Sequence, residues 1–252
     1  MQPRERPTLF IGLLVLGGCF ALFFAAGVHG ATTSKNAFRA LLARPDTVEY
    51  YEPGARAGQV AFLAPHGGLI EPGTEELART LAGATGSALY VLSYRGTPGD
   101  AERFHLSSAA YDPADSPALA RCLAASDTAI ALHGYEGPAR VIVGGRNTKF
   151  AATIAKRLQQ ALAPDYEVVW GNKAPRKLAG TARHNIVNRF RLAGVQIELP
   201  HRFREQVLAA RRRHSDPAAL RDVERFTQAI EASVAEWCGE HATTPHTGTQ
   251  LP

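Results

Sequence analysis

Two histidines and two glutamates stand where their chemistry could be combined. His66 and Glu71 share a glycine-rich segment, His133 is followed by Gly134, and Glu198 lies among apolar residues. Two histidines and one carboxylate are the protein ligands of many hydrolytic zinc sites, which keep one coordination position open for water. A second glutamate can then act as a general base. The four residues predict metal-assisted hydrolysis, with His66, Glu71 and His133 as ligands of one zinc ion and Glu198 as the base.

Each of these residues also has a structural interpretation when it is taken alone. A histidine flanked by glycines is common in loops, His133 could be a hydrogen-bonded core residue, and Glu198 could belong to a structural ion pair. Taken together they favour a catalytic metal site, because each residue follows or lies within a short apolar run typical of a strand. In sheets of this kind, functional residues gather at the carboxyl ends of the strands.

The apolar runs alternate with helical patterns along the chain, so we predict an α/β fold with a mixed central sheet flanked by helices in a single domain. The predicted strands span residues 59–64, 88–93, 103–107, 128–133, 139–144, 166–170 and 194–199. One predicted helix begins at Thr74, as its N-cap, and the others span residues 147–162, 201–213 and 217–237.

The alternation of side chains along the last predicted strand assigns a face to Glu198. It places Val195, Ile197 and Leu199 on one face and Gln196 and Glu198 on the other. An unpaired buried charge is costly, so a carboxylate among apolar neighbours needs a partner or a function. Gln196 shares the face of Glu198 and is expected to orient it.

Several segments resemble those of the poly-gamma-glutamate hydrolases, zinc peptidases known from bacteriophages and bacilli. The resemblance covers roughly residues 48–207, and the motifs occur in the family's order. The first and last motifs are quite specific, and those between them are less so. The matching segments are APHGGLIEPGTEELA (64–78), FHLSS (104–108), ALHGY (131–135), NIVNR (185–189) and GVQIEL (194–199), followed by Arg204.

The resemblance implies a carboxypeptidase-like fold with a single catalytic zinc ion. It carries the family's zinc ligands onto His66, Glu71 and His133 and its catalytic glutamate onto Glu198, and it implies hydrolysis of the γ-glutamyl amide links of poly-γ-glutamate. The chain departs from the family pattern at two places. Tyr135 stands where many members carry Cys. Residues 102–103, just before the motif that contains His105, replace an Asn-containing stretch. Both departures could alter the substrate pocket, and neither touches a proposed ligand.

Five further residues are candidates for binding substrate. Arg189 is the first candidate for a bidentate carboxylate contact, and Arg204 is the second, with an exposed helix charge as the alternative for Arg204. Asn185 and Asn188 could donate hydrogen bonds to substrate or could cap turns. His105 either lines the site or faces solvent from a strand.

The composition fits one folded domain, and the absence of several motifs argues against other kinds of chemistry. The 252 residues are 45% hydrophobic, enough for one core, and we predict a hydrolase domain over residues 36–240 and a disordered tail over 241–252. The net charge of +5 suits an acidic γ-glutamyl polymer or peptide without identifying it, and nucleic-acid binding has no other support. The chain has no G-x-S-x-G elbow, P-loop or C-x-x-C pair.

The first 30 residues read as a targeting segment. Residues 9–28 carry no charge, a length close to the roughly 20 residues that span a bilayer. They fit a cleaved signal peptide or an N-terminal membrane anchor, and Leu16–Cys19 looks like a lipobox although the apolar run continues beyond it. In each interpretation the body lies outside the cytoplasm, either secreted or anchored at the outer face of the membrane.

The sequence leaves both the state of two cysteines and the function open to alternatives. Cys122 and Cys238 form either a disulfide or two buried apolar positions. The function also has competitors: a zinc peptidase acting on γ-glutamyl links of cell-wall peptides, and a non-catalytic surface module that binds zinc or an acidic polymer. An intact Glu198 argues against the binding module, since binding alone needs no base.

Overall fold

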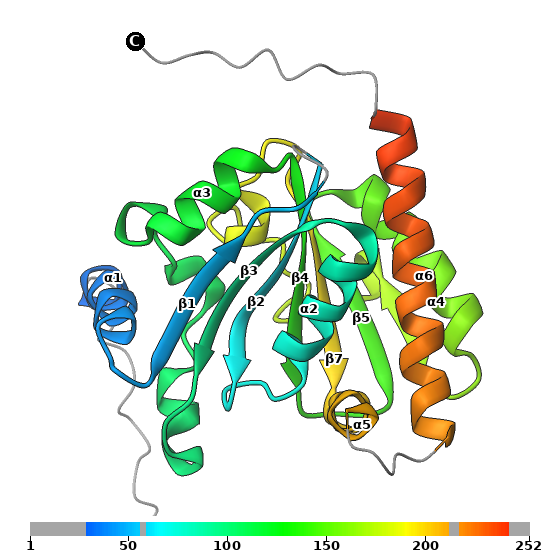
Figure 1. Ribbon diagram of the computed structural model, residues 1–252, viewed down its shortest axis with the longest axis horizontal. Coiled ribbons are helices and arrows are strands. Elements are labelled where there is room, and N and C mark those ends of the chain that lie inside the picture. The colour runs from blue at the N-terminus through cyan, green and yellow to red at the C-terminus, as the bar shows by residue number, and fades with distance from the viewer. Residues whose placement is uncertain (1–28, 56–58, 212–216, 242–252) are drawn as a thin grey trace, which may run out of the picture.

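The structure is a computed structural model that describes residues 29–55, 59–211 and 217–241. A single seven-stranded sheet lies between helices on both faces, which confirms the predicted fold class (Figure 1). Its strands are β1 (Thr47–Glu52), β2 (Val60–Gly68), β3 (Ala88–Tyr94), β4 (Thr128–Tyr135), β5 (Arg140–Gly145), β6 (Glu167–Trp170) and β7 (Val195–Pro200). The α-helices are α1 (His29–Leu42), α2 (Thr74–Thr85), α3 (Pro117–Ala125), α4 (Thr148–Leu162), α5 (His201–Ala210) and α6 (Pro217–His241).

The strands follow the order β1-β3-β2-β4-β7-β5-β6 across the sheet. The four strands β3, β2, β4 and β7 are parallel to one another. The edge strand β1 runs antiparallel to β3, and β5 runs antiparallel to β7 with β6 parallel beside it. The sheet is therefore mixed, and its central parallel strands all finish at the same edge, which is the lower end in Figure 1.

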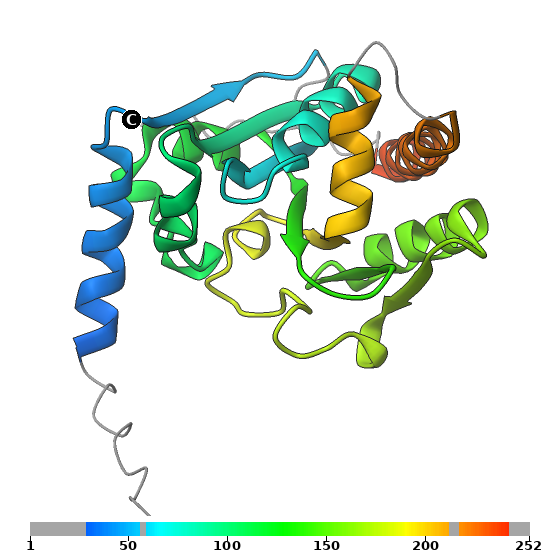
Figure 2. The same cartoon turned by 90° about the horizontal axis from the view of Figure 1, so that it is seen from below.

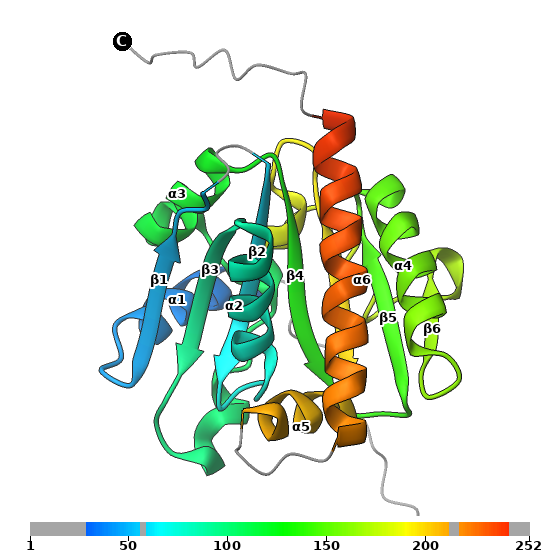
Figure 3. The same ribbon diagram turned by 45° about the vertical axis from the view of Figure 1, so that its right-hand side comes forward.

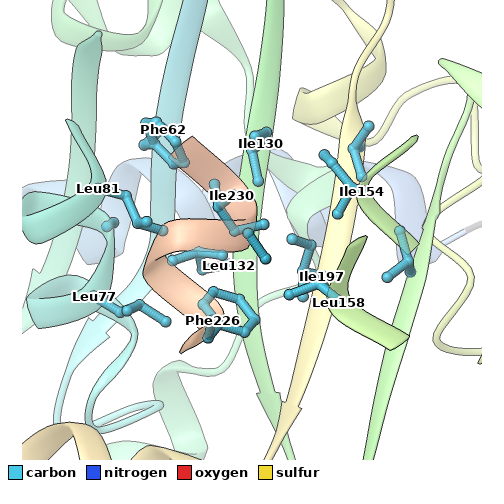
Figure 4. Packing of buried hydrophobic residues seen from close by; sticks show 14 of the residues in the cluster. Phe62, Leu77, Leu81, Ile130, Leu132, Ile154, Leu158, Ile197, Phe226 and Ile230 are labelled. Carbon is cyan, nitrogen blue, oxygen red and sulfur yellow. The ribbon is translucent and has the colours of Figure 1, made fainter. Parts of the chain in front are cut away.

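The helices α2, α4 and α6 cover one face of the sheet (Figure 3). Their apolar side chains interlock with those of the central strands in the larger core cluster, as Figure 4 shows. Phe62, Ile130 and Ile197 come from the strands, and Phe226 and Ile230 come from α6. All five are fully buried, so this face is the main hydrophobic support of the sheet.

The opposite face carries a second core cluster, built by α1, α3 and short 3₁₀ helices against the other side of β2, β3 and β4. Phe38 of α1 stacks on Tyr111, and both are fully buried. Cys122 lies in this second cluster, whereas Cys238 lies in the first. No disulfide joins them, which leaves two buried positions as the correct alternative for this pair.

The predicted strands form within four residues of their expected ends, except for residues 103–107. That prediction is wrong: residues 98–104 form a 3₁₀ helix that starts at Pro98. The physical reason is the edge of the sheet, because β1 already pairs with the free side of β3 and leaves no partner for another strand there. The predicted cap of α2 is also displaced, since Gly73 occupies the N-cap and Thr74 is the first helical residue.

Within the described residues, no helix is both long and apolar enough to cross a membrane. Residues 1–28, which hold most of the predicted signal or anchor, lie outside the described part of the chain. The same is true of residues 242–252 of the predicted tail, while His241 is the last residue of α6.

Candidate metal centre and active-site cleft

The site lies where the chain changes direction across the sheet. From β2 the chain passes through α2 to β3 on one side, and from β3 through α3 to β4 on the other side of β2. The helix α2 packs in the first core cluster and α3 in the second, so the segments that leave β2 and β3 go to opposite faces of the sheet. His66 and His133 stand near the carboxyl ends of the neighbouring strands β2 and β4. Figure 2 views the molecule from this end.

A β-bulge determines the direction in which His66 points. Ala64 pairs with Val91 but Gly67 pairs with Ser93, so β2 contains one more residue than β3 over this stretch. Before the bulge, Ala64 faces α2; after it, Gly67 lies against Glu75 of α2. His66 therefore points to the opposite face, the one that also carries His133. Without the extra residue, the alternation of β2 would turn His66 toward α2.

The turn after β2 delivers Glu71 to the same place. The Glu71 amide donates to the His66 carbonyl at 2.8 Å, and the Thr74 hydroxyl donates to the Glu71 carbonyl at 2.8 Å. The side chain is buried, and its Oε2 accepts a hydrogen bond from the Gly134 amide at 2.8 Å. Burial alone would raise the pKa of the Glu71 carboxyl, but the surrounding histidines, His66 first among them, hold that pKa well below its usual value.

Three donor side chains converge on one point. His66 Nδ1 lies 2.8 Å from Glu71 Oε1, and His133 Nδ1 lies 3.2 Å from His66 Nδ1 and 3.7 Å from Glu71 Oε2. The outer ring nitrogens are engaged elsewhere: His66 Nε2 donates to the Leu106 carbonyl at 2.7 Å, and His133 Nε2 lies 3.4 Å from Ser108 Oγ. Because the Leu106 carbonyl can only accept, His66 Nδ1 is left as a lone-pair donor in the neutral ring.

His105 is a fourth member of this cluster. Its Nε2 lies 2.9 Å from Glu71 Oε1, and a hydrogen bond to Glu71 raises the pKa of the His105 imidazole. The donor atoms of His66, Glu71 and His105 also lie within 4.8 Å of one another. The His105 side chain is 38% exposed, however, whereas that of His133 is 5% exposed and supported through its other nitrogen. The donor set of two histidines and a carboxylate fits zinc with either histidine as the third ligand.

Glu198 of β7 is the direct neighbour of His133 in the sheet. Burial raises the pKa of the Glu198 carboxyl to about 7. A hydrogen-bond chain fixes its orientation: Asn185 Nδ2 donates to Gln196 Oε1 at 2.8 Å, and Gln196 Nε2 donates to Glu198 Oε1 at 2.7 Å. Gln196 therefore orients Glu198, as the strand alternation predicts.

A cleft of about 620 Å³ opens over these residues. His66, Glu71, His133 and Glu198 line it together. One wall comes from residues 105–109 after the first 3₁₀ helix, and the other from the loop between β6 and β7, over residues 171–182. The structure thus assembles the four predicted metal and catalytic residues in one accessible place.

The predicted substrate-binding residues are only partly brought to the cleft. His105 and Asn185 line it, although the Asn185 side chain also caps a 3₁₀ helix by accepting from the Val187 amide. Asn188 lies outside the lining and braces the loop, donating to the carbonyls of Gly180 and Ala182. Arg189 also lies outside it and donates to the His184 carbonyl.

Arg204 is neither an exposed helix charge nor a residue of the cleft. Its guanidinium is buried on the far side of Gly134 and donates to the Pro72 carbonyl at 3.2 Å and to Glu136 at 2.9 Å. A Cβ on Gly134 would lie 2.5 Å from Arg204 Nε, so a larger residue after His133 would displace this guanidinium. Arg204 thus ties the turn that carries Glu71 to the end of β4.

Arg176 and Lys177 line the cleft although sequence reasoning passed over them. They lie in a loop without helical or strand periodicity, so the pattern of apolar residues gives no clue to their direction. The only available signal was an adjacent cationic pair in a Gly- and Pro-containing linker.

Comparison with known proteins gives consistent matches. The family model described as poly-gamma-glutamate hydrolase matches residues 38–232. The SPbeta prophage-derived UPF0714 protein YoqZ of Bacillus subtilis (strain 168) is 34% identical over 56% of this chain and 48% of its own length. The UPF0714 protein YndL of the same organism is 31% identical over 59% of this chain and 56% of its own length. This chain therefore spans about half the length of these curated relatives.

Two solved structures share the fold. The structure of a bacteriophage poly-gamma-glutamate hydrolase aligns with a TM-score of 0.61 and 26% identity, over 76% of this chain and 90% of the other. A structure of YndL described as apo and zinc-free aligns with a TM-score of 0.62 and 26% identity, over 75% of this chain and 91% of the other.

Proposed function

This chain belongs to the poly-gamma-glutamate hydrolase family, and we propose that it is a zinc-dependent enzyme that hydrolyses γ-glutamyl amide bonds. The observation that carries the proposal is the convergence of His66, Glu71 and His133 beside Glu198 in one cleft. The zinc-free YndL structure supports the choice of metal, since its description names zinc for a relative.

The ligands we propose are His66 Nδ1, His133 Nδ1 and the Glu71 carboxylate. Each is held by a second contact: to the Leu106 carbonyl, to Ser108 Oγ and to the Gly134 amide, respectively. Such outer contacts fix the ring orientation and are typical of metal ligands. When bound, zinc supplies a Lewis acid that favours deprotonation of water near neutral pH and polarises a carbonyl.

Glu198 then acts as the base. Its Oε2 accepts a proton from the attacking water and later delivers it to the leaving amine, while Gln196 holds Oε1. The raised pKa of Glu198, about 7, suits a group that must both accept and donate a proton near neutral pH. His105 stands at the cleft wall with its ring beside Glu71, where it can donate a hydrogen bond to a bound carbonyl.

The identity of the third ligand can be tested directly. His133→Ala is expected to lose bound zinc, and His105→Ala is expected to retain it, because only His133 is buried and supported from behind. Zinc content and competition with a chromogenic chelator measure both. Loss of zinc in His105→Ala with retention in His133→Ala would make His105 the third ligand.

The substrate we propose is an acidic γ-glutamyl polymer or peptide. The cleft is lined mostly by polar, histidine and basic side chains, which suits a hydrophilic chain. Poly-γ-glutamate is the first choice because of family membership. Cell-wall peptides with γ-linked glutamate are the alternative for the same chemistry.

We also propose that the enzyme acts outside the cytoplasm, either secreted or held at the outer face of the membrane. The support is the uncharged run over residues 9–28 that follows a basic start. Fractionation of expressing cells, with N-terminal sequencing of the product, tests this. A soluble cytoplasmic product with its original N-terminus would contradict it.

The hydrolase proposal is tested with the full chain, its bound metal and poly-γ-glutamate. We expect about one zinc per chain and shortening of the polymer that stops when a chelator removes the metal. Glu198→Gln should retain zinc and lose the activity. Zinc without shortening moves the search to γ-glutamyl wall peptides, and a folded protein without zinc contradicts the ligand assignment.

A further inference from the structure

The wall of the cleft formed by residues 171–182 carries two cationic side chains, Arg176 and Lys177. Both are exposed, and neither forms an ion pair with an acidic side chain in the described part of the chain. They are the only Arg or Lys residues among the described residues that line this cleft. Their charges are therefore available to a bound anion.

The loop that carries them is fixed to the body from both sides. Asn188 Nδ2 donates to the Gly180 and Ala182 carbonyls at 2.7 and 2.9 Å, and the Gly145 amide donates to the Ala179 carbonyl at 2.8 Å. Ala174 and Ala179 are buried in a small core cluster. A loop held in this way keeps its cationic residues on one wall, so less ordering entropy is lost when an anion binds.

The same loop is coupled to the catalytic glutamate. Gln196 Nε2 donates to the Leu178 carbonyl at 3.3 Å as well as to Glu198 Oε1 at 2.7 Å. Gly180 lies so close to Gln196 that a Cβ there would be 2.6 Å from its side chain. A group bound by residues 176–177 is thus held at a fixed position relative to Glu198.

We propose that Arg176 and Lys177 form a carboxylate-binding subsite that recognises the free carboxylates flanking the scissile amide. The inference rests on the proposed hydrolase function and assigns its charge specificity. In a γ-linked glutamate chain the α-carboxylates are not consumed by the linkage, so each residue presents one anion beside an amide. The two arginines favoured by sequence cannot perform this role, because Arg189 and Arg204 lie outside the cleft.

The test compares Arg176→Gln/Lys177→Gln with Lys173→Gln in the zinc-loaded full chain. Lys173 is a matched control, since it is an exposed cation of the same loop that does not line the cleft. The substrates are a γ-linked glutamate oligomer and the same oligomer with its α-carboxylates converted to amides. For the acidic oligomer, we expect the double variant to raise KM about tenfold with little change in kcat. Lys173→Gln should resemble the wild type.

A binding measurement makes the result independent of turnover. In a Glu198→Gln background, fluorescence anisotropy of a labelled acidic oligomer should show about tenfold weaker binding and a flatter salt dependence after removal of both charges. Binding of the amidated oligomer should not change. Equal binding by the double variant and by Lys173→Gln overturns the subsite. Equal binding of the acidic and the amidated oligomer by the wild-type enzyme also overturns the subsite. A wild-type enzyme that binds the acidic oligomer but hydrolyses neither oligomer contradicts only the proposed hydrolysis.

Discussion

At the scale of single residues, Glu198 is a carboxylate held where its charge is disfavoured. Burial raises its pKa from the ordinary 4.5 to about 7, so the folded protein holds this proton more tightly than the unfolded chain does. Stability from this group is therefore present below pH 4.5 and is lost as the pH rises through 7. A shift of this size corresponds to about 3 kcal/mol.

Replacing Glu198 by Gln should stabilise the metal-free protein in a pH-dependent way. The free energy of unfolding should exceed that of the wild type by up to about 3 kcal/mol at pH 8, because the amide carries no charge to bury. The difference should shrink at pH 5. Urea unfolding of both proteins in chelator at the two pH values measures it. An equal difference at both pH values would show that Glu198 is not the titrating group.

Replacing Gln196 should lower kcat without changing zinc binding. Replacing it by Met removes the donor to Glu198 Oε1 while keeping a similar volume. Hydrogen bonds to charged groups contribute roughly 1.5–3 kcal/mol, so kcat should fall by about one to two orders of magnitude with KM little changed. Steady-state kinetics and zinc analysis check this. Loss of zinc in this variant would mean that Gln196 supports the ligands instead.

At the scale of elements, the bulge in β2 decides whether His66 reaches the site, and Tyr111 supports it. The fully buried Tyr111 hydroxyl donates to the Pro65 carbonyl at 2.6 Å, within the bulge. Tyr90 provides a comparison, since its ring is also fully buried and its hydroxyl donates to Glu49 at 2.8 Å, away from the cleft.

Tyr111→Phe and Tyr90→Phe should therefore separate stability from metal binding. Each should lower the free energy of unfolding by about 1–3 kcal/mol: Tyr111→Phe removes the donor to the buried Pro65 carbonyl, and Tyr90→Phe removes a donor to the partly buried Glu49 carboxylate, which keeps its hydrogen bond from Ser116. Only Tyr111→Phe should weaken zinc binding, because only it loosens the strand that carries His66. Denaturant unfolding and chelator competition measure the two effects. Equal zinc affinity in both variants would remove Tyr111 from the support of the site.

The sequence allows the elements to be predicted better than their pairing. Apolar runs locate the strands, and the positions of His66, His133 and Glu198 at or near their carboxyl ends follow from those runs. The bulge does not, since an extra residue is defined only relative to the neighbouring strand. The false strand at 103–107 and the unpredicted β1 have one common cause, because which segment pairs with β3 is decided by the fold and not by local pattern.

At the scale of the whole molecule, the helix α1 stands at the β1 edge and extends away from the body (Figure 2). Its last turns pack against the body: Phe38 and Leu41 are buried, and Phe38 stacks on Tyr111. The helix is thus connected through Tyr111 to the bulge and to His66.

Shortening the chain should show this connection. A protein that begins at Ala43 loses both apolar side chains, each contributing about 1.5–3 kcal/mol when fully buried, and should be several kcal/mol less stable than one that begins at His29. Its zinc affinity should fall as well. Urea unfolding and chelator competition compare the two. Unchanged stability would mean that α1 is not part of the folded body.

Long-range packing also explains which site residues the sequence missed. His133 and Glu198 lie within regular strands, so their directions can be predicted from alternation, whereas the direction of His66 depends on the bulge and that of Glu71 on the turn after β2. Arg189 and Arg204 are candidates from their side-chain type and their place in the family's motifs, but the direction of a side chain on a turn or helix depends on what packs beside it. Arg204 is drawn toward Gly134 and Pro72, and the cations of the cleft come instead from a loop without periodicity.

The bulge in β2 has a consequence for how this segment can change in length. A substitution at Pro65 changes one side chain, but a deletion or insertion between Ala64 and His66 reverses the face of every later residue in the strand. The imidazole would then point into the apolar layer beneath α2, with the spacing from His66 to Glu71 still intact. An alignment of this chain with any active relative should therefore contain no gap from Ala64 to His66, and an active protein with a one-residue gap there would require a different ligand.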